Sequence, residues 1–180
     1  MEQPLIYDNF LSEQEYELLS RFSFFDNSSY WENLEQIENA GIACLVEKLR
    51  PIASFSDVVG IEYWCGQIDK FTETVEDFVT GTRYALPPHV DKDEVQYLEN
   101  FEVVSPLWGA IFYAFDGPVK GGLLEIPGQV ITPVKNRLVI FDVKKLHAVT
   151  AVTEGTRNSI TLNFWDHQIA TAPLYPDPSV

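Results

Sequence analysis

The sequence predicts an α+β fold that is mainly β, in which N-terminal helices pack on one side of a β-sandwich or barrel. Helical periodicity is confined to the part of the chain before Pro51. Beyond it, short runs of β-branched and aromatic residues alternate with turn residues such as glycine, proline, asparagine and aspartate. Helices first and many short strands afterwards are typical of a mainly-β domain with helices on one face.

The N-terminal region has the pattern of a short strand followed by a helix. Leu5-Ile6-Tyr7 is a short apolar run, and Ser12 and Glu15 have the spacing of a capping box. Apolar residues then recur at helical spacing, at Tyr16, Leu19 and Phe22. We therefore expect a helix to begin directly after Ser12.

A second helix is expected over about Asn33 to Arg50. Its apolar side consists of Leu34, Ile37, Ala40, Ile42, Leu45, Val46 and Leu49. Pro51 follows and cannot continue the helix, so it marks the C-terminal end.

The remainder of the chain is expected to form strands. The strand-like runs are Val58–Ile68, Phe71–Tyr84, Trp108–Phe115, Gly122–Ile126, Arg137–Phe141, Ala148–Val152 and Asn158–Trp165. No internal repeat or linker divides them, so residues 1–171 are expected to form a single domain. The last nine residues, 172–180, include three prolines and are expected to be an extended tail.

Composition limits the classes of function. The chain has 180 residues, 46% of them hydrophobic, and a net charge of −15, which makes nucleic acids and anionic membranes poor partners. It has no apolar run long enough to span a bilayer and no basic, apolar start of a secretory signal. We expect a cytoplasmic protein whose two cysteines are reduced.

A His-x-Asp triplet is the first candidate for chemistry. In an extended segment His89 and Asp91 point to one side, so an imidazole and a carboxylate can converge on one metal ion. His147 lies 147 − 91 = 56 residues later, directly after a strand-like run. Two histidines and one carboxylate on one face of a metal are typical of non-haem Fe(II) oxygenases.

Arg157 is the second candidate. It lies 157 − 147 = 10 residues after His147, and a hairpin over residues 147–165 would return its side chain to the metal cavity. A guanidinium there can bind a carboxylate through two hydrogen bonds. The alternative for Arg157 is a surface salt bridge. His167 lies beyond the last strand and is expected on the surface.

These motifs, in this order, resemble the iron(II)/2-oxoglutarate dioxygenases, and among them the prolyl-hydroxylase-like branch. The supporting segments are Tyr7-Asp8-Asn9-Phe10-Leu11-Ser12, Leu86-Pro87-Pro88-His89-Val90-Asp91, Ala110-Ile111-Phe112-Tyr113, Gly121-Gly122-Leu123-Leu124 and Asn136-Arg137-Leu138-Val139-Ile140-Phe141. The family often has a tyrosine about ten residues before the first metal-binding histidine. This sequence lacks it, and Tyr63 is the candidate replacement.

The resemblance implies a double-stranded β-helix, also called a jelly-roll, with helices outside it. It implies Fe(II) held by His89, Asp91 and His147, with 2-oxoglutarate and O2 as cosubstrates and ascorbate as a candidate reductant. The far carboxylate of 2-oxoglutarate would meet Arg157, Tyr113 and Thr161. The implied reaction hydroxylates an aliphatic C–H bond of an amino acid, a peptidyl residue or a small metabolite, and releases succinate and CO2.

Three alternatives remain open from the sequence alone. The first is a cupin-like module that binds a metal or small ligand without turnover, and the second is a 2-oxoglutarate sensor. The third, a nucleic-acid demethylase, is disfavoured by the negative charge. Acidic residues beside the metal-binding triplet, Asp93 and Glu94, favour a basic or zwitterionic substrate. The oligomeric state is left open.

Overall fold

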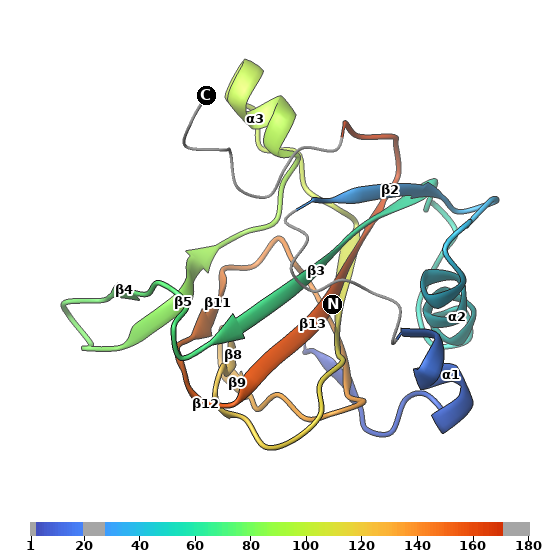
Figure 1. The fold of residues 1–180 in the computed structure, drawn as a ribbon. Coiled ribbons are helices and arrows are strands. Elements are labelled where there is room, and N and C mark those ends of the chain that lie inside the picture. Colours follow the sequence, from blue (N-terminus) through green and yellow to red (C-terminus); the bar gives the residue numbers. More distant parts are fainter. Residues whose placement is uncertain (1–2, 20–27, 171–180) are drawn as a thin grey trace.

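The computed structural model describes residues 3–19 and 28–170, which form two main antiparallel sheets with two of the helices on one side and a third at one end (Figure 1). The six-stranded sheet has the order β1 (Leu5–Tyr7), β10 (Leu138–Phe141), β6 (Trp108–Tyr113), β13 (Thr156–Trp165), β3 (Gly60–Asp69) and β2 (Tyr30–Asn33). The five-stranded sheet has the order β4 (Val75–Glu76), β5 (Arg83–His89), β11 (His147–Thr150), β8 (Leu124–Ile126) and β9 (Gln129–Ile131). A two-stranded sheet pairs β12 (Val152–Glu154) with β7 (Lys120–Gly121). The predicted mainly-β jelly-roll is confirmed.

The helices are α1 (Glu13–Leu18), α2 (Ala40–Leu49) and α3 (Glu94–Asn100). Helix α1 begins as the sequence predicts, because Ser12 and Glu15 form both hydrogen bonds of the capping box. Phe22, one of the apolar positions predicted for this helix, lies outside the described residues. The predicted C-terminal tail, 172–180, also lies outside them. Within residues 3–19 and 28–170, no helix has the length and apolar character that crossing a membrane requires.

Helix α2 is shorter than the sequence predicts. The expected start near Asn33 is wrong, because Tyr30–Asn33 pairs with β3 as an edge strand and the helix begins at Ala40. Polar side chains explain the difference. Glu32 accepts hydrogen bonds from the backbone N–H groups of Glu38 and Asn39, and Asn39 caps the helix by accepting from Gly41 and Ile42.

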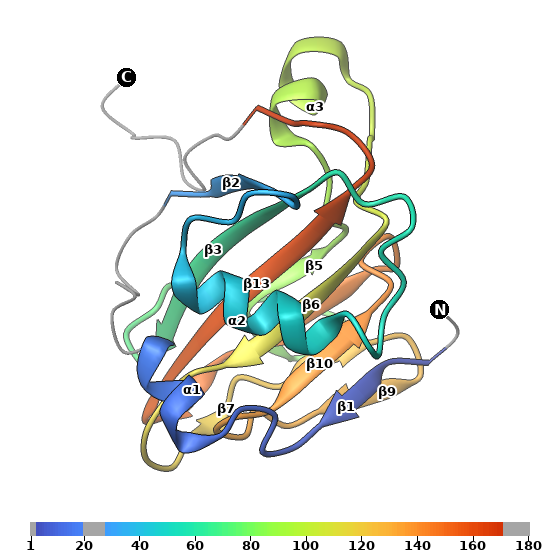
Figure 2. The ribbon, with the colours of Figure 1, turned by 90° about the vertical axis from the view of Figure 1, so that its right-hand side faces the viewer.

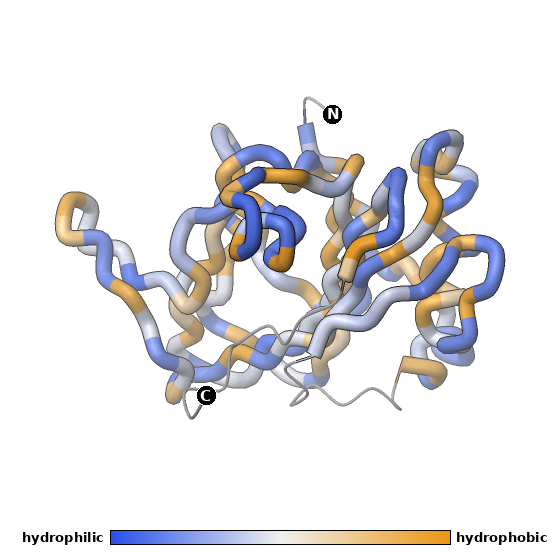
Figure 3. The backbone as a smooth tube through the Cα atoms, turned by 90° about the horizontal axis from the view of Figure 1, so that it is seen from above, coloured by the Kyte–Doolittle hydropathy of each residue, from blue (hydrophilic) through white to orange (hydrophobic). Residues whose placement is uncertain are grey.

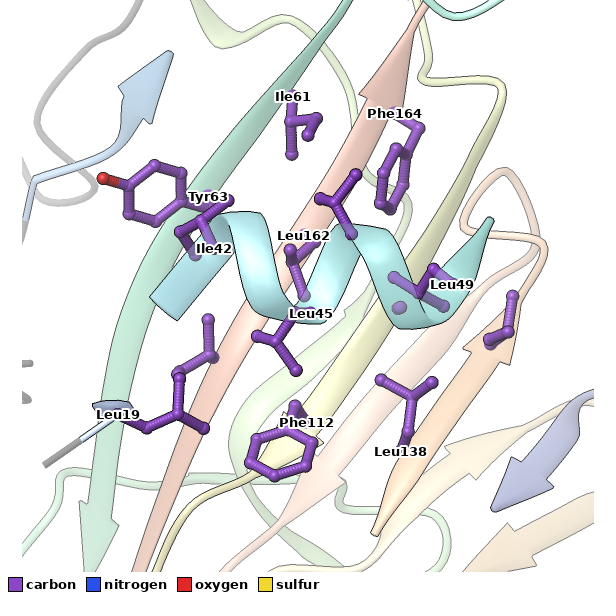
Figure 4. Close-up of a cluster of buried hydrophobic side chains, with 14 of the residues drawn as sticks. Leu19, Ile42, Leu45, Leu49, Ile61, Tyr63, Phe112, Leu138, Leu162 and Phe164 are labelled. Carbon is purple, nitrogen blue, oxygen red and sulfur yellow. The ribbon is translucent and has the colours of Figure 1, made fainter. Parts of the chain in front are cut away.

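The outer face of the six-stranded sheet is covered by α2, which lies across it (Figure 2). Figure 4 shows Ile42, Leu45 and Leu49 of α2 packed toward Leu162 and Phe164 of β13, and all five side chains have no exposed area. Because successive side chains of a strand point to opposite faces, this packing turns Arg157, Ser159, Thr161 and Asn163 toward the inside of the jelly-roll. The hydrophobic core thereby fixes which residues of β13 line the site.

Two other sequence predictions need correction. Instead of one strand over Phe71–Tyr84, the structure has the two-residue strand β4, a turn, and then β5. Aspartates cause the interruption, since Asp69 accepts from the backbone of Phe71 and Thr72, and Asp77 accepts from Val79 and Thr80. Helix α3 was not predicted, because it buries no residue and so shows no apolar period.

Candidate active site

A cavity of about 670 Å³ lies between the two main sheets. One wall is formed by β3 and β13 of the six-stranded sheet, and the other by β5 and β11 of the five-stranded sheet. All three predicted metal ligands and Arg157 line this cavity. Its walls between these polar groups are apolar, with Ile111, Leu124, Phe141 and Val149.

Two adjacent strands position the predicted metal ligands. His89 is the last residue of β5 and His147 is the first of β11, and the two residues face each other in the antiparallel ladder. Asp91 follows β5 directly, and its backbone N–H donates to the carbonyl of Val143. One side-chain ligand atom from each of His89, Asp91 and His147 lies within 4.8 Å of the other two. These residues can therefore hold one metal ion.

Hydrogen bonds orient both imidazoles for metal binding. Nδ1 of His89 lies 2.7 Å from the carbonyl oxygen of Pro87, and Nδ1 of His147 lies 2.9 Å from that of Lys145. A carbonyl can only accept, so each Nδ1 donates and each Nε2 carries the free lone pair. The Nε2 atoms lie 3.7 Å (His89) and 3.3 Å (His147) from Oδ1 of Asp91. Hydrogen bonds from Nδ1 to a backbone carbonyl, with Nε2 left for the metal, are typical of metal-binding histidines.

The electrostatics of the two histidines differ. Burial, together with the charge of its neighbour His147, lowers the pKa of His89. Burial also disfavours the cation of His147, but the hydrogen bond and charge of Asp91 outweigh it and raise the pKa of His147. Asp91 therefore favours a positive charge at this position, and a divalent metal ion supplies it without a proton.

Arg157 lies at the other end of the cavity wall. Its side chain is 2% exposed, and Nη1 donates to Oγ of Ser159 over 3.1 Å. The guanidinium carbon lies 5.0 Å from the ring centre of Tyr113. The alternative of a surface salt bridge for Arg157 is wrong, since the residue is buried and forms no salt bridge with any residue in 3–19 or 28–170.

The residues around Arg157 fit the far carboxylate of 2-oxoglutarate. Nε of Arg157 and Oη of Tyr113 are buried and have no hydrogen-bond partner within the described part of the chain. Buried polar groups are almost always paired, so two orphaned donors side by side indicate an acceptor that binds there. Thr161 lines the same cavity on the same face of β13. Five of the six site residues predicted from the sequence line this cavity, and the sixth, Tyr113, lies behind the wall in contact with Arg157.

Three details of the predicted site are different. Residues 147–165 do not form a hairpin, because β11 and β13 belong to opposite sheets and face each other across the cavity. Tyr63 does not replace the missing tyrosine, since it points to the helix-covered face and stacks on Tyr30 with ring centres 5.4 Å apart. His167 is exposed and outside the cavity, as predicted.

Gly122 is a positioning residue that sequence reasoning did not assign. A Cβ atom at Gly122 would lie 2.8 Å from Cδ of Arg157 and 2.9 Å from Cγ2 of Val152. The aliphatic part of Arg157 therefore packs directly on the glycine backbone. The Gly121-Gly122 motif was noted in the sequence as part of the family resemblance. Only the structure shows that Gly122 makes room for the side chain of Arg157.

We expect Gly122→Ala to weaken the binding of 2-oxoglutarate by up to about 100-fold, because a displacement of about 1 Å in a binding group can have that effect. Isothermal titration of the metal-loaded protein measures it. Gly128→Ala is the matched control, since Gly128 also has a positive φ (81° against 64°) but has nothing within 4 Å of an added Cβ. Equal affinities of the two variants would contradict this role of Gly122.

Two polar residues at the end of the wall opposite Arg157 were not among the site residues predicted from the sequence. Glu62 of β3 and Asn163 of β13 are paired in register and line the cavity. Burial, followed by the neighbouring charge of Asp91, raises the pKa of Glu62 to about 7, although hydrogen bonding from Ser29 acts in the opposite direction. Neither residue belongs to a motif, so only the strand register could have revealed them.

The fold and this arrangement of ligands define a non-haem Fe(II) oxygenase of the jelly-roll type. Residues 78–165 match the family described as the 2OG-Fe(II) oxygenase superfamily, and this segment contains all three predicted metal ligands and Arg157. The matched segment, 165 − 78 + 1 = 88 of the 180 residues, carries a ligand set that fits the Fe(II) and 2-oxoglutarate of this superfamily. A comparison with curated protein sequences finds no match.

Solved structures with similar folds include enzymes with different substrates. A viral collagen prolyl hydroxylase from Paramecium bursaria Chlorella virus-1 has a TM-score of 0.58 at 15% identity, covering 89% of this chain and 88% of that chain. A prolyl hydroxylase from Trichoplax adhaerens, in complex with a peptide of hypoxia inducible factor, has a TM-score of 0.54 at 13% identity, covering 91% and 83%. NgTET1 in complex with 5mC DNA has a TM-score of 0.52 at 13% identity, covering 90% and 71%. At these identities the likeness concerns the fold alone.

Proposed function

We propose that this protein is a 2-oxoglutarate-dependent Fe(II) hydroxylase that acts on an aliphatic C–H bond of a peptidyl residue. In this proposal His89, Asp91 and His147 hold the iron, and Arg157 with Tyr113 and Thr161 binds the far carboxylate of 2-oxoglutarate. One observation carries the proposal: the three ligand side chains and a buried arginine without a counter-charge line the same cavity.

The bound iron and 2-oxoglutarate would supply the oxidising chemistry, in which 2-oxoglutarate is converted to succinate and CO2 as the substrate gains a hydroxyl group. The protein's own contribution is orientation and the exclusion of water. The hydrogen bonds of Pro87 and Lys145 fix the two imidazoles. Arg157 would orient the cosubstrate through its positive charge and through two parallel hydrogen bonds from its guanidinium to the carboxylate. The apolar walls of the cavity keep the reacting region dry.

Exposed apolar residues on two segments that continue from the cavity walls favour a polypeptide substrate over a free metabolite. The tip of the β4–β5 hairpin carries Phe78 and Val79, which are 94% and 95% exposed, and it stands away from the sheets as a hydrophobic loop (Figure 3). Leu98 and Phe101, in and after α3, are exposed as well. Both segments adjoin cavity-lining residues of β5 and of the loop that precedes α3. Exposed apolar surface of this kind is typical of binding sites for polypeptides.

Nucleic acids are not part of the proposal, although one similar structure contains DNA. The net charge of −15 repels a polyphosphate backbone. Among the residues that line the cavity only Lys92 and Arg157 are basic, and Lys92 is paired with Glu94.

The proposal is tested by incubating the purified protein with Fe(II), 2-oxoglutarate, O2 and a library of synthetic peptides. We expect succinate release that depends on peptide, together with a peptide product that has gained one oxygen atom by mass spectrometry. Isotopically labelled O2 should deliver its label to that product. Tight binding of metal and 2-oxoglutarate without any oxygenated product would instead support the sensor alternative.

A further inference from the structure

The charged groups that line the cavity are paired with one exception. Asp91 lies beside His147 at the metal site, Lys92 forms a salt bridge with Glu94, and Asp69 is bound by its own turn. In the proposed function Arg157 is paired with the cosubstrate. Glu62 faces the cavity, forms no salt bridge within the described residues and, unlike Asp69, is not bound by a turn of its own; its hydrogen-bond partners Ser29 and Trp165 are uncharged.

The direction of the Glu62 side chain follows from its strand. Its neighbours Ile61 and Tyr63 belong to the core beneath α2, so the alternation of β3 turns Glu62 into the cavity. The charges of Asp91, which also lines the cavity, and of Asp93, which caps α3, both raise the pKa of Glu62. A carboxyl group held there among like charges is more stable as an anion when a cation binds to it.

Asn163 provides a second, independent observation at the same end of the cavity. It is paired in register with Glu62, is 1% exposed, and its Oδ1 atom has no hydrogen-bond partner within residues 3–19 and 28–170. Its opposite neighbour on β6 is Gly109, where a Cβ would lie 2.7 Å from that oxygen. A buried acceptor without a partner, at the same end of the cavity as a carboxyl group without a cation, points to a cationic ligand with N–H donors.

We propose that Glu62, together with Asn163, binds a cationic nitrogen group of the substrate, such as the ammonium of a lysine side chain, and so determines substrate specificity. This inference rests on the proposed function, because it assigns the part of the cavity that 2-oxoglutarate would leave open. Arg157 and Asn163 are six positions apart on β13, about 20 Å along an extended strand. In this proposal the cosubstrate binds at the Arg157 end of the cavity and the substrate cation binds at the opposite end, at Glu62.

The test uses two model substrates of nearly equal shape, Nα-acetyl-L-lysine methylamide and Nα-acetyl-L-norleucine methylamide. Their binding to the Mn(II)- and 2-oxoglutarate-loaded protein is measured by titration calorimetry under nitrogen, and their stimulation of succinate release with Fe(II) in air. We expect the lysine derivative to bind at least about tenfold more tightly, since a desolvated charge pair is worth this much or more. Free L-lysine, as a third arm, shows whether an α-ammonium group can serve equally well.

Glu62→Gln should reduce the lysine-to-norleucine preference to about one while the affinity for 2-oxoglutarate stays unchanged. Asp69→Asn is the matched control, because Asp69 also lines the cavity but its carboxylate binds Phe71 and Thr72. That variant should keep the preference. Equal binding of both model substrates by the wild type, or a preference that survives Glu62→Gln, would overturn the inference while 2-oxoglutarate still binds. Failure to bind 2-oxoglutarate would overturn the proposed function as well.

Discussion

Replacing His147 with alanine is expected to weaken Fe(II) or Mn(II) binding by more than about 100-fold. Loss of a hydrogen-bond partner of a metal ligand already costs about 10- to 100-fold, and His147 is a ligand itself in the proposed function. The substitution also leaves Asp91 buried without its neighbour at 3.3 Å. Competition with a fluorescent chelator measures the metal affinity of the variant.

His167→Ala is the control for His147→Ala. His167 is exposed and pairs with Asp166 outside the cavity, so its loss should leave metal affinity within about twofold of the wild type. Should His147→Ala retain wild-type affinity in a folded protein, the assignment of this residue to the metal site would be wrong.

Replacing Arg157 with methionine is expected to have opposite effects on binding and on stability. Truncating one member of a buried charge pair costs about 2–5 kcal/mol, so affinity for 2-oxoglutarate should fall by at least about 30-fold. Without the cosubstrate, however, Arg157 is a buried cation whose guanidinium donates a hydrogen bond to Ser159. Replacing buried charged groups with apolar ones often stabilises by about 1–4 kcal/mol, so the ligand-free variant should melt at a higher temperature than the wild type.

Thermal melting with and without cosubstrate measures both effects of Arg157→Met. At 100 times its Kd, 2-oxoglutarate should stabilise the metal-loaded wild type by about 2.7 kcal/mol and the variant by almost nothing. Arg50→Met is a suitable control, since Arg50 is exposed and contacts Glu47 and the ring of Phe55, and none of the three lines the cavity. A variant that still gains stability from 2-oxoglutarate would show that the cosubstrate binds elsewhere.

The residues proposed to hold the metal and the cosubstrate were predicted partly from a local motif and partly from spacing and family resemblance. His89 and Asp91 are two positions apart in an extended segment, which places them on one side whatever the rest of the fold. The capping box of Ser12 and Glu15 is equally local and was confirmed. Strand β13 was predicted because Ile160, Leu162 and Phe164 alternate with polar residues in its second half.

The remaining features depend on contacts between distant segments or on polar competition for the backbone. Helix α2 begins later than predicted because the carboxylate of Glu32 accepts a hydrogen bond from the backbone N–H of Asn39, seven residues later. Helix α3 lacks buried residues, so no hydrophobic period could reveal it. Glu62 and Asn163 meet only through the β3–β13 register, with about 100 residues between them.

The central claim is that one cavity binds Fe(II) through His89, Asp91 and His147 and 2-oxoglutarate through Arg157. The most direct measurement is the visible spectrum of the protein reconstituted anaerobically with Fe(II) and 2-oxoglutarate. We expect a weak charge-transfer band that requires both ligands and is absent from His147→Ala and, at the same cosubstrate concentration, from Arg157→Met. A protein that binds Fe(II) but shows no band with 2-oxoglutarate, or a band unaffected by both substitutions, would contradict the account.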